Sequence, residues 1–465
     1  MTARPNLLFV LADQLRASSL PLYGGSNIAT PNLDRLATEG VTFTNALSTA
    51  PVCTPYRSML LTGRHPQTTG HLMNFVRTRH SELSIADAFA RQGYRTGWIG
   101  KWHLHTGAFP TIDAVDYVPE GRDRLGFQFW RGYNFHTSYF DGPVNLDNWH
   151  TERWEGYETH ALNRYAFEFM DRVGEEPFCL FLSPHQPHFT PGRFAPESYY
   201  ARLPDVIELP ANVPVEKQEE ARAMLRHYLA MTLALDDMLG DLLDDLERRG
   251  KAENTLVVFA SDHGTQAGAH GVRPWEKRHP YQESLHVPLI VRLPGTLDGG
   301  KTCEALNAPV DLFPSLCSLF DVPIPRTVEG IDLSGAWLGV PGAREQEAVL
   351  TMNFSAQFDW LADGLEWRGV RTKRYNYSRW LDGRTELYDL AHDPLEMHNL
   401  AGEPQHRALE ERMESLMREL QARRGDELVP CTQWSNWFDA QRRVVRNAYG
   451  PLSHPEDGPD WSLLR

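Results

Sequence analysis

Apolar runs of strand length alternate along the chain with longer segments whose apolar residues recur at helical spacing. Buried strands are predicted at 6–12, 178–183, 255–261 and 288–293. A helix is predicted at 30–40, with Thr30 as its N-cap and Pro31 in its first turn, and a long helix at 219–249. This alternation predicts an α/β fold: a large, mostly parallel sheet sandwiched by helices.

The pattern changes between 321 and 345, where proline and glycine become frequent. We therefore predict a first domain at 1–335 and a smaller C-terminal α+β domain at 346–465. Strands of this second domain are expected at 348–352, 367–377 and 386–390. A polar amphipathic helix is expected at about 404–424, and the last forty residues are expected to be irregular, as a tail of the second domain.

The composition is that of an ordinary globular protein: 465 residues, 41% hydrophobic, with a net charge of −15. This charge argues against a nucleic-acid-binding surface. The apolar run at 7–12 is too short for a secretory signal, and no run approaches the roughly 20 residues of a membrane helix. The five cysteines are scattered, without a CxxC motif, so disulfides are not expected. We therefore expect a cytoplasmic protein that contacts neither nucleic acid nor membrane.

Reactive polar residues follow two of the predicted strands. Asp13 and Gln14 come directly after the first strand, and Asp262 and His263 come directly after the strand at 255–261. Ligands of open α/β sheets bind at the carboxyl ends of the strands, where these side chains are expected. The oxygen-rich set suits Ca²⁺, Mg²⁺ or Mn²⁺ better than a structural zinc. Either acid alone could instead cap a turn.

A cysteine precedes a further predicted helix. Thr54 and Pro55 are a good N-cap and first-turn pair for a helix that runs to Leu61. Cys53 would then face the helix N-terminus, where the dipole favours an anion, and Arg57 would point to the same end. The residues alone leave two other interpretations open, a buried thiol before an ordinary helix and a nucleophilic cysteine with a low pKa.

The segment CTPYRSMLLTGR, which begins at Cys53, resembles the signature of type I sulfatases, C-x-P-x-R followed by T-G-R. This family belongs to the alkaline phosphatase superfamily, and a maturation enzyme oxidises its signature cysteine to formylglycine. The resemblance implies an alkaline-phosphatase-like fold and a sulfuric ester hydrolase of the arylsulfatase type. It also implies one divalent metal ion, with Ca²⁺ expected first and Mn²⁺ or Mg²⁺ as alternatives. The implied metal ligands are Asp13, Gln14, Cys53, Asp262 and His263.

Three other segments resemble active-site segments of the family: GKWHLH, SPHQPHFTP and HGVRPWEKRHPYQESLHVPLIV. The catalytic residues that the resemblance implies are Cys53, Arg57, Lys101, His103, His188 and Lys277. It implies two substrate-binding residues, His185 and Asn74, of which Asn74 lies 21 residues after Cys53. Each of these residues alone has an ordinary structural interpretation, and their joint occurrence in family order favours a site.

The expected function is the hydrolysis of a sulfate monoester of a small molecule or saccharide, by a formylglycine nucleophile and a divalent metal. An alternative is a phosphonate monoester or phosphodiester hydrolase on the same scaffold. Asp13-Gln14 and Asn74 favour this alternative, because they are similar to residues of choline sulfatases and phosphonate monoester hydrolases. A non-catalytic binding protein and a thiolate hydrolase are further alternatives. The sequence leaves the natural substrate and assembly into a homo-oligomer open.

Overall fold

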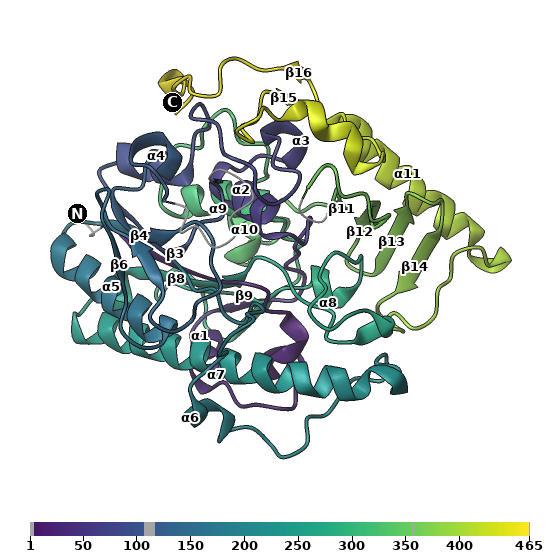
Figure 1. The fold of residues 1–465 in the computed structure, drawn as a ribbon, viewed down its shortest axis with the longest axis horizontal. Coiled ribbons are helices and arrows are strands. Elements are labelled where there is room, and N and C mark those ends of the chain that lie inside the picture. The colour runs from purple at the N-terminus through teal and green to yellow at the C-terminus, as the bar shows by residue number, and fades with distance from the viewer. Residues whose placement is uncertain (1–3, 107–116, 356–357, 465) are drawn as a thin grey trace.

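The computed structural model describes residues 4–106, 117–355 and 358–464, and a large sheet between two layers of helices dominates it (Figure 1). From edge to edge the large sheet contains β10 (Lys301–Cys303), β2 (Val41–Phe43), β9 (Leu289–Arg292), β8 (Thr255–Ser261), β1 (Asn6–Ala12), β7 (Phe178–Ser183), β3 (Arg95–Lys101), β4 (Phe129–Tyr133), β5 (Pro143–Asn145) and β6 (Thr151–Arg153). The predicted α/β class is confirmed.

The centre of this sheet is parallel and its margins are mixed. β8, β1, β7, β3 and β4 run parallel to one another, whereas β9 is antiparallel to both of its neighbours, and so are β5 and β6 to theirs. Every residue of β1, β7 and β8 is buried, as expected for strands that helices cover on both faces. This double burial explains why these strands are continuous apolar runs.

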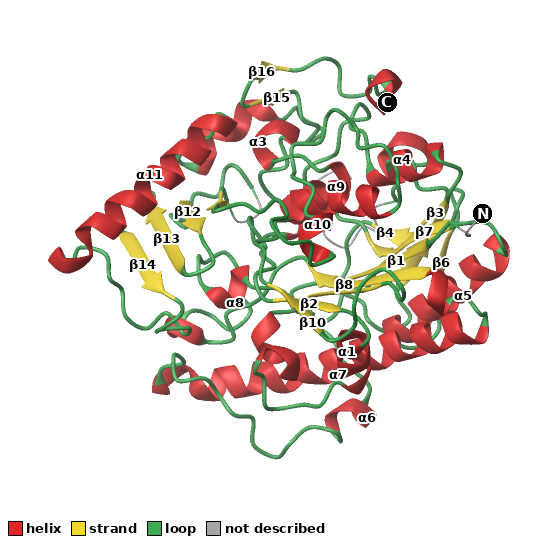
Figure 2. Ribbon diagram, turned by 180° about the vertical axis from the view of Figure 1, so that it is seen from behind, coloured by secondary structure: helices red, strands yellow, loops and turns green. Residues whose placement is uncertain are grey.

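Helices cover both faces (Figure 2). One layer contains α1 (Pro31–Thr38), α5 (Glu158–Val173) and α7 (Gln218–Arg248), and the other α2 (Cys53–Thr62), α4 (Ile85–Arg91), α9 (Pro309–Leu319) and α10 (Ser334–Trp337). Leu8 and Val10 of β1 pack toward the first layer, and Leu7 and Phe9 toward the second. The alternation of side chains along each strand thus builds two cores.

Short helical segments fill the connections. They are α3 (Pro66–Thr69), α6 (Glu197–Tyr200), α8 (Gln282–Leu285) and the 3₁₀ turns Ala17–Ser19, Pro21–Tyr23, Gly121–Arg124, Val215–Lys217, Ala252–Asn254, Ala269–Gly271, Pro404–His406, Cys431–Trp437 and Trp461–Leu464. Among the described residues no helix combines the length and apolarity that a membrane crossing requires.

Two helix starts differ from the prediction. Thr30 occupies the N-cap position of α1, but its side chain makes no capping bond. Asp236 of α7 caps the helix instead, since Oδ1 accepts a hydrogen bond of 2.8 Å from the amide of Leu33. The prediction of Thr54 as N-cap is wrong, because Val52 is the N-cap and α2 begins at Cys53, two residues before Pro55.

A second sheet follows in the C-terminal region. It is an antiparallel meander of β11 (Val349–Asn353), β12 (Trp367–Arg371), β13 (Tyr375–Trp380) and β14 (Thr385–Asp389), against which α11 (Arg407–Arg424) packs. The single strand expected at 367–377 is therefore two strands. The turn between them forms because Thr372 accepts a hydrogen bond of 2.8 Å from the amide of Tyr375. The division into domains at 1–335 and 346–465 stays a prediction.

The chain after α11 is mostly irregular and returns to the first sheet. It contains the strand pair β15 (Arg446–Asn447) and β16 (Gly450–Pro451). The amide of Arg326 donates to the carbonyl of Leu463, and Leu464 joins the core on the α9 side. The end of the chain is thus packed against residues that precede the second sheet.

Candidate active site

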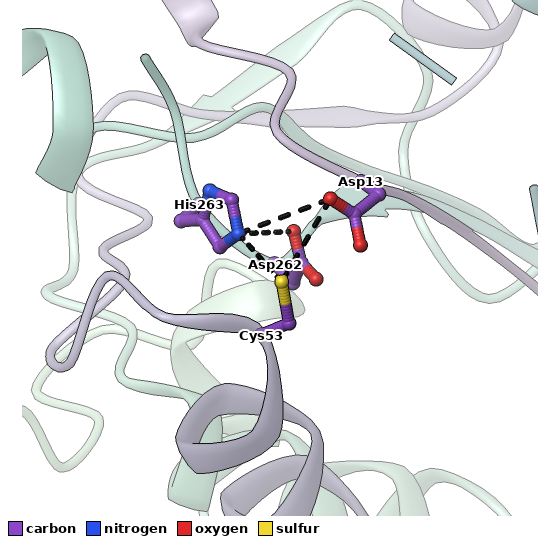
Figure 3. A group of neighbouring side chains, drawn as sticks. All are labelled: Asp13, Cys53, Asp262 and His263. Carbon is purple, nitrogen blue, oxygen red and sulfur yellow. Dashed lines mark hydrogen bonds and ion pairs between the residues drawn. The ribbon is translucent and has the colours of Figure 1, made fainter. Parts of the chain in front are cut away.

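Two acids and a histidine meet at the carboxyl ends of β1 and β8. Asp13 follows β1, and Asp262 and His263 follow β8. The parallel pairing of these strands places Ala12 opposite Ser261 and so brings the three side chains together. Cys53, the first residue of α2, is 3.2 Å from His263 (Sγ to Nε2) and 4.0 Å from Asp13 (Sγ to Oδ1) (Figure 3). All four residues are fully buried.

These four residues have the chemistry of a divalent-cation site. Their potential ligand atoms lie within 4.8 Å of one another. Nδ1 of His263 is 3.0 Å from the carbonyl of Gly264, which leaves Nε2 directed at the cluster. Burial, followed by the neighbouring Asp13, raises the pKa of Asp262 to about 6. A bound cation would relieve this repulsion between two buried carboxylates, so the residues present fit the expected ion.

Gln14, a predicted metal ligand, is fixed beside this group. Its backbone amide donates to Oδ1 of Asp262 at 3.0 Å. Its side-chain nitrogen donates to the hydroxyl of Thr265 at 3.1 Å and to the carbonyl of Trp275 at 2.9 Å. Both amide hydrogens are thereby used, and the oxygen Oε1 is the atom that Gln14 can offer a cation. Its role as a ligand stays a prediction.

Arg57 clamps the two acids. Its guanidinium donates to Asp262 at 3.2 Å (Nε to Oδ2) and to Asp13 at 3.0 Å (Nη2 to Oδ2). Nη1 donates to the carbonyl of Lys101 and to the hydroxyl of Ser183, each at 2.8 Å. Burial disfavours the charged form of Arg57, but the carboxylates of Asp262 and Asp13 outweigh this effect and raise the pKa of Arg57. The geometry therefore supports Arg57 as a positioning residue.

Two lysines approach Cys53. Nζ of Lys101, at the end of β3, is 3.6 Å from Sγ and donates to Oδ2 of Asp13 at 2.6 Å. Nζ of Lys277 is 3.3 Å from Sγ and 3.2 Å from Nε2 of His263. Burial would raise the pKa of Asp13, but Lys101 holds it well below its usual range. The site thus combines charged acids with two ammonium groups, of which that of Lys101 is buried and that of Lys277 half-buried.

The histidines of SPHQPHFTP each face one of these lysines. Nε2 of His185 is 3.0 Å from Nζ of Lys101, and Nε2 of His188 is 3.3 Å from Nζ of Lys277. Nδ1 of His188 is 2.8 Å from the carbonyl of Phe189, and that hydrogen bond places its proton on Nδ1. Burial, followed by Lys277, lowers the pKa of His188 well below its usual value. A neutral His188 therefore accepts a hydrogen bond from a charged Lys277.

The remaining predicted residues lie next to the start of α2. The backbone carbonyl of His103 accepts a hydrogen bond of 2.6 Å from the hydroxyl of Thr54. The His103 ring stacks on Phe135, with 4.8 Å between ring centroids, and its two nitrogens have no hydrogen-bond partner among the described residues. Oδ1 of Asn74 accepts a hydrogen bond of 3.1 Å from the amide of Thr54. The predicted substrate contact thus caps the helix that carries Cys53.

Sequence reasoning missed two residues that support the site. Ser183 ends β7 and holds Arg57, and its only signal is its place before Pro-His in a strand-end motif. Glu158, the first residue of α5, is fully buried and accepts hydrogen bonds from the Tyr133 hydroxyl and the amide of His185. Burial raises the pKa of Glu158 to about 7. No sequence signal separates this glutamate from any other at a helix start.

The fold and this site define a hydrolase with an alkaline-phosphatase-like architecture. The sulfatase family model matches residues 5–322, and a model described as the C-terminal part of N-sulphoglucosamine sulphohydrolase matches residues 268–423. The chain belongs to the sulfatase family, and it is a sulfuric ester hydrolase. The alternative of a phosphonate monoester hydrolase is not favoured by these matches.

Similar proteins extend over nearly the whole chain. The ulvan-active sulfatase of Formosa agariphila is 36% identical over 431 residues, which cover 91% of this chain and 82% of that protein. The N-acetylglucosamine-6-O-sulfatase of Bacteroides thetaiotaomicron is 25% identical, with coverages of 96% and 91%. The crystal structure of the sulfatase YidJ of Bacteroides fragilis superimposes with a TM-score of 0.81 at 27% identity, with coverages of 93% and 97%.

Proposed function

We propose that this sulfatase removes sulfate from saccharide sulfate esters, with formylglycine derived from Cys53 and one divalent cation, Ca²⁺ before Mn²⁺ or Mg²⁺. The observation that carries the proposal is the surrounding of Cys53: an imidazole at 3.2 Å and two ammonium groups at 3.3 Å and 3.6 Å from Sγ. The saccharide is supported by the name of the relative from Bacteroides thetaiotaomicron. Maturation would require a formylglycine-generating enzyme as a partner.

Asp13, Asp262 and His263 would hold the cation, with Oε1 of Gln14 as a further oxygen ligand. When bound, the cation supplies positive charge to the oxygens of the sulfate group. Conversion of Cys53 would replace Sγ by oxygen on Cβ, and the formylglycine so formed supplies a hydrated aldehyde as the nucleophile. Arg57 would keep both acids charged and oriented, because it binds a carboxylate oxygen of each.

Lys101 and Lys277 would bind the anionic part of the substrate. Their Nζ atoms lie 3.6 Å and 3.3 Å from Sγ of Cys53, so both ammonium groups face the same side chain. Lys101 is buried and Lys277 is half-buried, so charges that they direct at sulfate oxygens are screened less than at an open surface. They would thereby offset the repulsion between a sulfate ester and its nucleophile.

The pair of His188 and Lys277 would protonate the leaving alcohol. Burial opposes a charge on Lys277, but Cys53, Asp13 and Asp262 raise its pKa. The two carboxylates remain when Cys53 is converted, while His188 is neutral. The proton would therefore stay on Lys277 until charge develops on the leaving oxygen, and His188 would orient it. His103 is the candidate base for the second half of the reaction, because burial, followed by Lys101, keeps its imidazole neutral.

The test compares three substrates of the matured, Ca²⁺-loaded enzyme. Sulfated N-acetylglucosamine, an aryl sulfate and an aryl phosphonate monoester are assayed in parallel, with a Cys53→Ala preparation as the control for contaminating enzymes. We expect the sulfated sugar to have the highest kcat/KM. A higher kcat/KM on the phosphonate would overturn the proposed substrate class, and equal activity of Cys53→Ala would overturn the nucleophile.

A further inference from the structure

A second group of ligand-type side chains lies outside the site around Cys53. It contains His270 in the turn after β8, Glu283 in α8 and Glu396 in the loop that follows β14. One potential ligand atom of each lies within 4.8 Å of the others. We propose that these three side chains bind one divalent transition-metal ion, of the Zn²⁺ type. The ion would join the loop of Lys277 to the C-terminal sheet.

The spacing within the group is that of ligands rather than of hydrogen-bond partners. Nε2 of His270 is 3.6 Å from Oε2 of Glu283, which is longer than an ordinary hydrogen bond. Two ligand atoms on a tetrahedral zinc ion are about 3.3 Å apart, given bonds of about 2.0–2.1 Å. A small movement of either side chain would therefore complete a ligand pair.

One carboxylate oxygen directed into the group has no hydrogen-bond donor of the described chain within ordinary reach. Glu283 is 5% exposed, and its Oε2 has no hydrogen-bond partner among the described residues. Its ion pair with His270, at 3.6 Å, is long, so this buried oxygen is poorly satisfied. A cation at this position would satisfy it.

Asn212 can supply a fourth ligand. Its side-chain nitrogen faces three acceptors with two hydrogens: Glu283 at 2.7 Å, the carbonyl of Leu395 at 3.2 Å and Nε2 of His270 at 3.3 Å. Its oxygen Oδ1 is buried and lacks a hydrogen-bond partner in the described part of the chain. A half-turn of the amide exchanges the two atoms. The oxygen would then lie 3.3 Å from Nε2 of His270, and an ion bound by both Asn212 and Glu283 would replace the hydrogen bond of 2.7 Å that the half-turn breaks.

The charges of the group balance a dication. Burial, followed by Glu283, raises the pKa of Glu396 to about 7, whereas burial of Glu283 is outweighed by His270, which lowers its pKa. The oxygens of Glu396 are oriented by the amide of Gln282 at 2.7 Å and by Asn376 at 2.6 Å. Two carboxylates would neutralise the ion, and neighbouring Arg371 is the cation that would weaken its binding.

The donor set selects the kind of ion. An imidazole with carboxylate oxygens suits Zn²⁺ and its neighbours in the transition series better than Ca²⁺. Tyr281 stacks on the His270 ring at 3.9 Å between centroids and holds it in place. The His270 side chain is 13% exposed, so solvent reaches one edge of the group. An ion can therefore enter without unfolding of the loop.

The test separates this site from the one around Cys53. Asp13→Asn/Asp262→Asn chains are stripped with a chelator and titrated with Zn²⁺ by calorimetry, and the bound metal is counted by mass spectrometry. We expect one Zn²⁺ per chain. Adding Glu396→Gln should weaken binding at least about tenfold, whereas adding His279→Ala, a nearby histidine outside the group, should not. Failure to bind Zn²⁺, or equal binding by the Glu396→Gln chain, would overturn the proposal.

Wild-type protein gives a second measurement, which does not depend on the folding of the double variant. With the Cys53 site saturated with Ca²⁺, added Co²⁺ should produce the intense visible absorption of a four-coordinate ion. The His270→Ala variant should lose this band, and His279→Ala should keep it. A weak, six-coordinate spectrum that is unchanged in His270→Ala would contradict the site.

Discussion

Lys277 and Cys53 are 224 positions apart in the sequence, yet Nζ of Lys277 lies 3.3 Å from Sγ of Cys53. Cys53 is brought there by the start of α2, and Lys277 by the long loop that follows β8. The same ammonium group is 3.3 Å from Nε2 of His188. Lys277 thus contacts both Cys53, where the nucleophile would form, and the imidazole of His188, which would face the leaving group.

Replacing Lys277 by alanine should lower kcat roughly 10²–10⁴-fold on a sulfated sugar, because the leaving alcohol loses its proton donor. An aryl sulfate with an acidic phenol needs less protonation, so its kcat should fall less. The measurement is kcat on both substrates. Lys373→Ala, a half-exposed lysine paired with Glu345, is the control and should leave both rates unchanged. An equal loss on both substrates would exclude Lys277 from proton delivery.

Cys53 should be about 18 Da lighter than an unmodified cysteine in the mature protein, as expected from its conversion to formylglycine. Mass spectrometry of the peptide that contains residue 53 measures the change. Cys53→Ala should abolish activity, by roughly 10³-fold or more, since the nucleophile is removed. Cys179, buried in β7 and remote from the site motif, is the internal control and should keep its full mass. An unmodified residue 53 in fully active protein would contradict the proposed nucleophile.

Much of the fold could be predicted because its central strands are buried on both faces. Burial on both sides makes β1, β7 and β8 continuous apolar runs, which are visible in the sequence. The capping of α1 could not be predicted in this way. Its acceptor, Asp236, is 203 residues from Leu33, and only the tertiary structure brings them together.

The residues of the candidate site could likewise be predicted only in part. Residues in recognisable motifs, such as Cys53 and Lys277, can be predicted from the sequence, and the structure brings them together. Ser183 and Glu158 cannot, because a serine at a strand end and a glutamate at a helix start have many structural uses. Their importance follows from their partners, Arg57 and His185, and those contacts are long-range.

Glu158→Gln should make the protein more stable above neutral pH. The pKa of Glu158 rises from 4.5 to about 7 in the folded state, so the folded protein holds a proton that the unfolded chain has released. Stability therefore falls as the pH rises through this interval, by about 3 kcal/mol when the acid is ionised in both states. Glutamine removes this penalty, and a half-turn of the Gln186 amide, whose nitrogen now donates to Oε2 of Glu158 at 3.1 Å, would let its unpartnered Oε1 accept the new amide hydrogen.

The measurement is the free energy of unfolding of both proteins at about pH 5 and about pH 8. The advantage of Glu158→Gln should be larger at the higher pH. Glu253→Gln, at an exposed position, is the matched control and should show no such change. A constant difference between Glu158→Gln and wild type at both pH values would show that Glu158 keeps an ordinary pKa in the folded protein.

Asn74→Ala should affect the enzyme through α2 rather than through substrate affinity. Oδ1 of Asn74 accepts the amide hydrogen of Thr54, next to Cys53, and this amide is buried. Loss of the cap should lower the free energy of unfolding by about 1–2 kcal/mol and reduce kcat, because the side chain at position 53 is less well fixed. Asn74→Asp retains an acceptor and should restore most of the stability. If Asn74 binds substrate instead, Asn74→Ala should raise KM and leave unfolding unchanged.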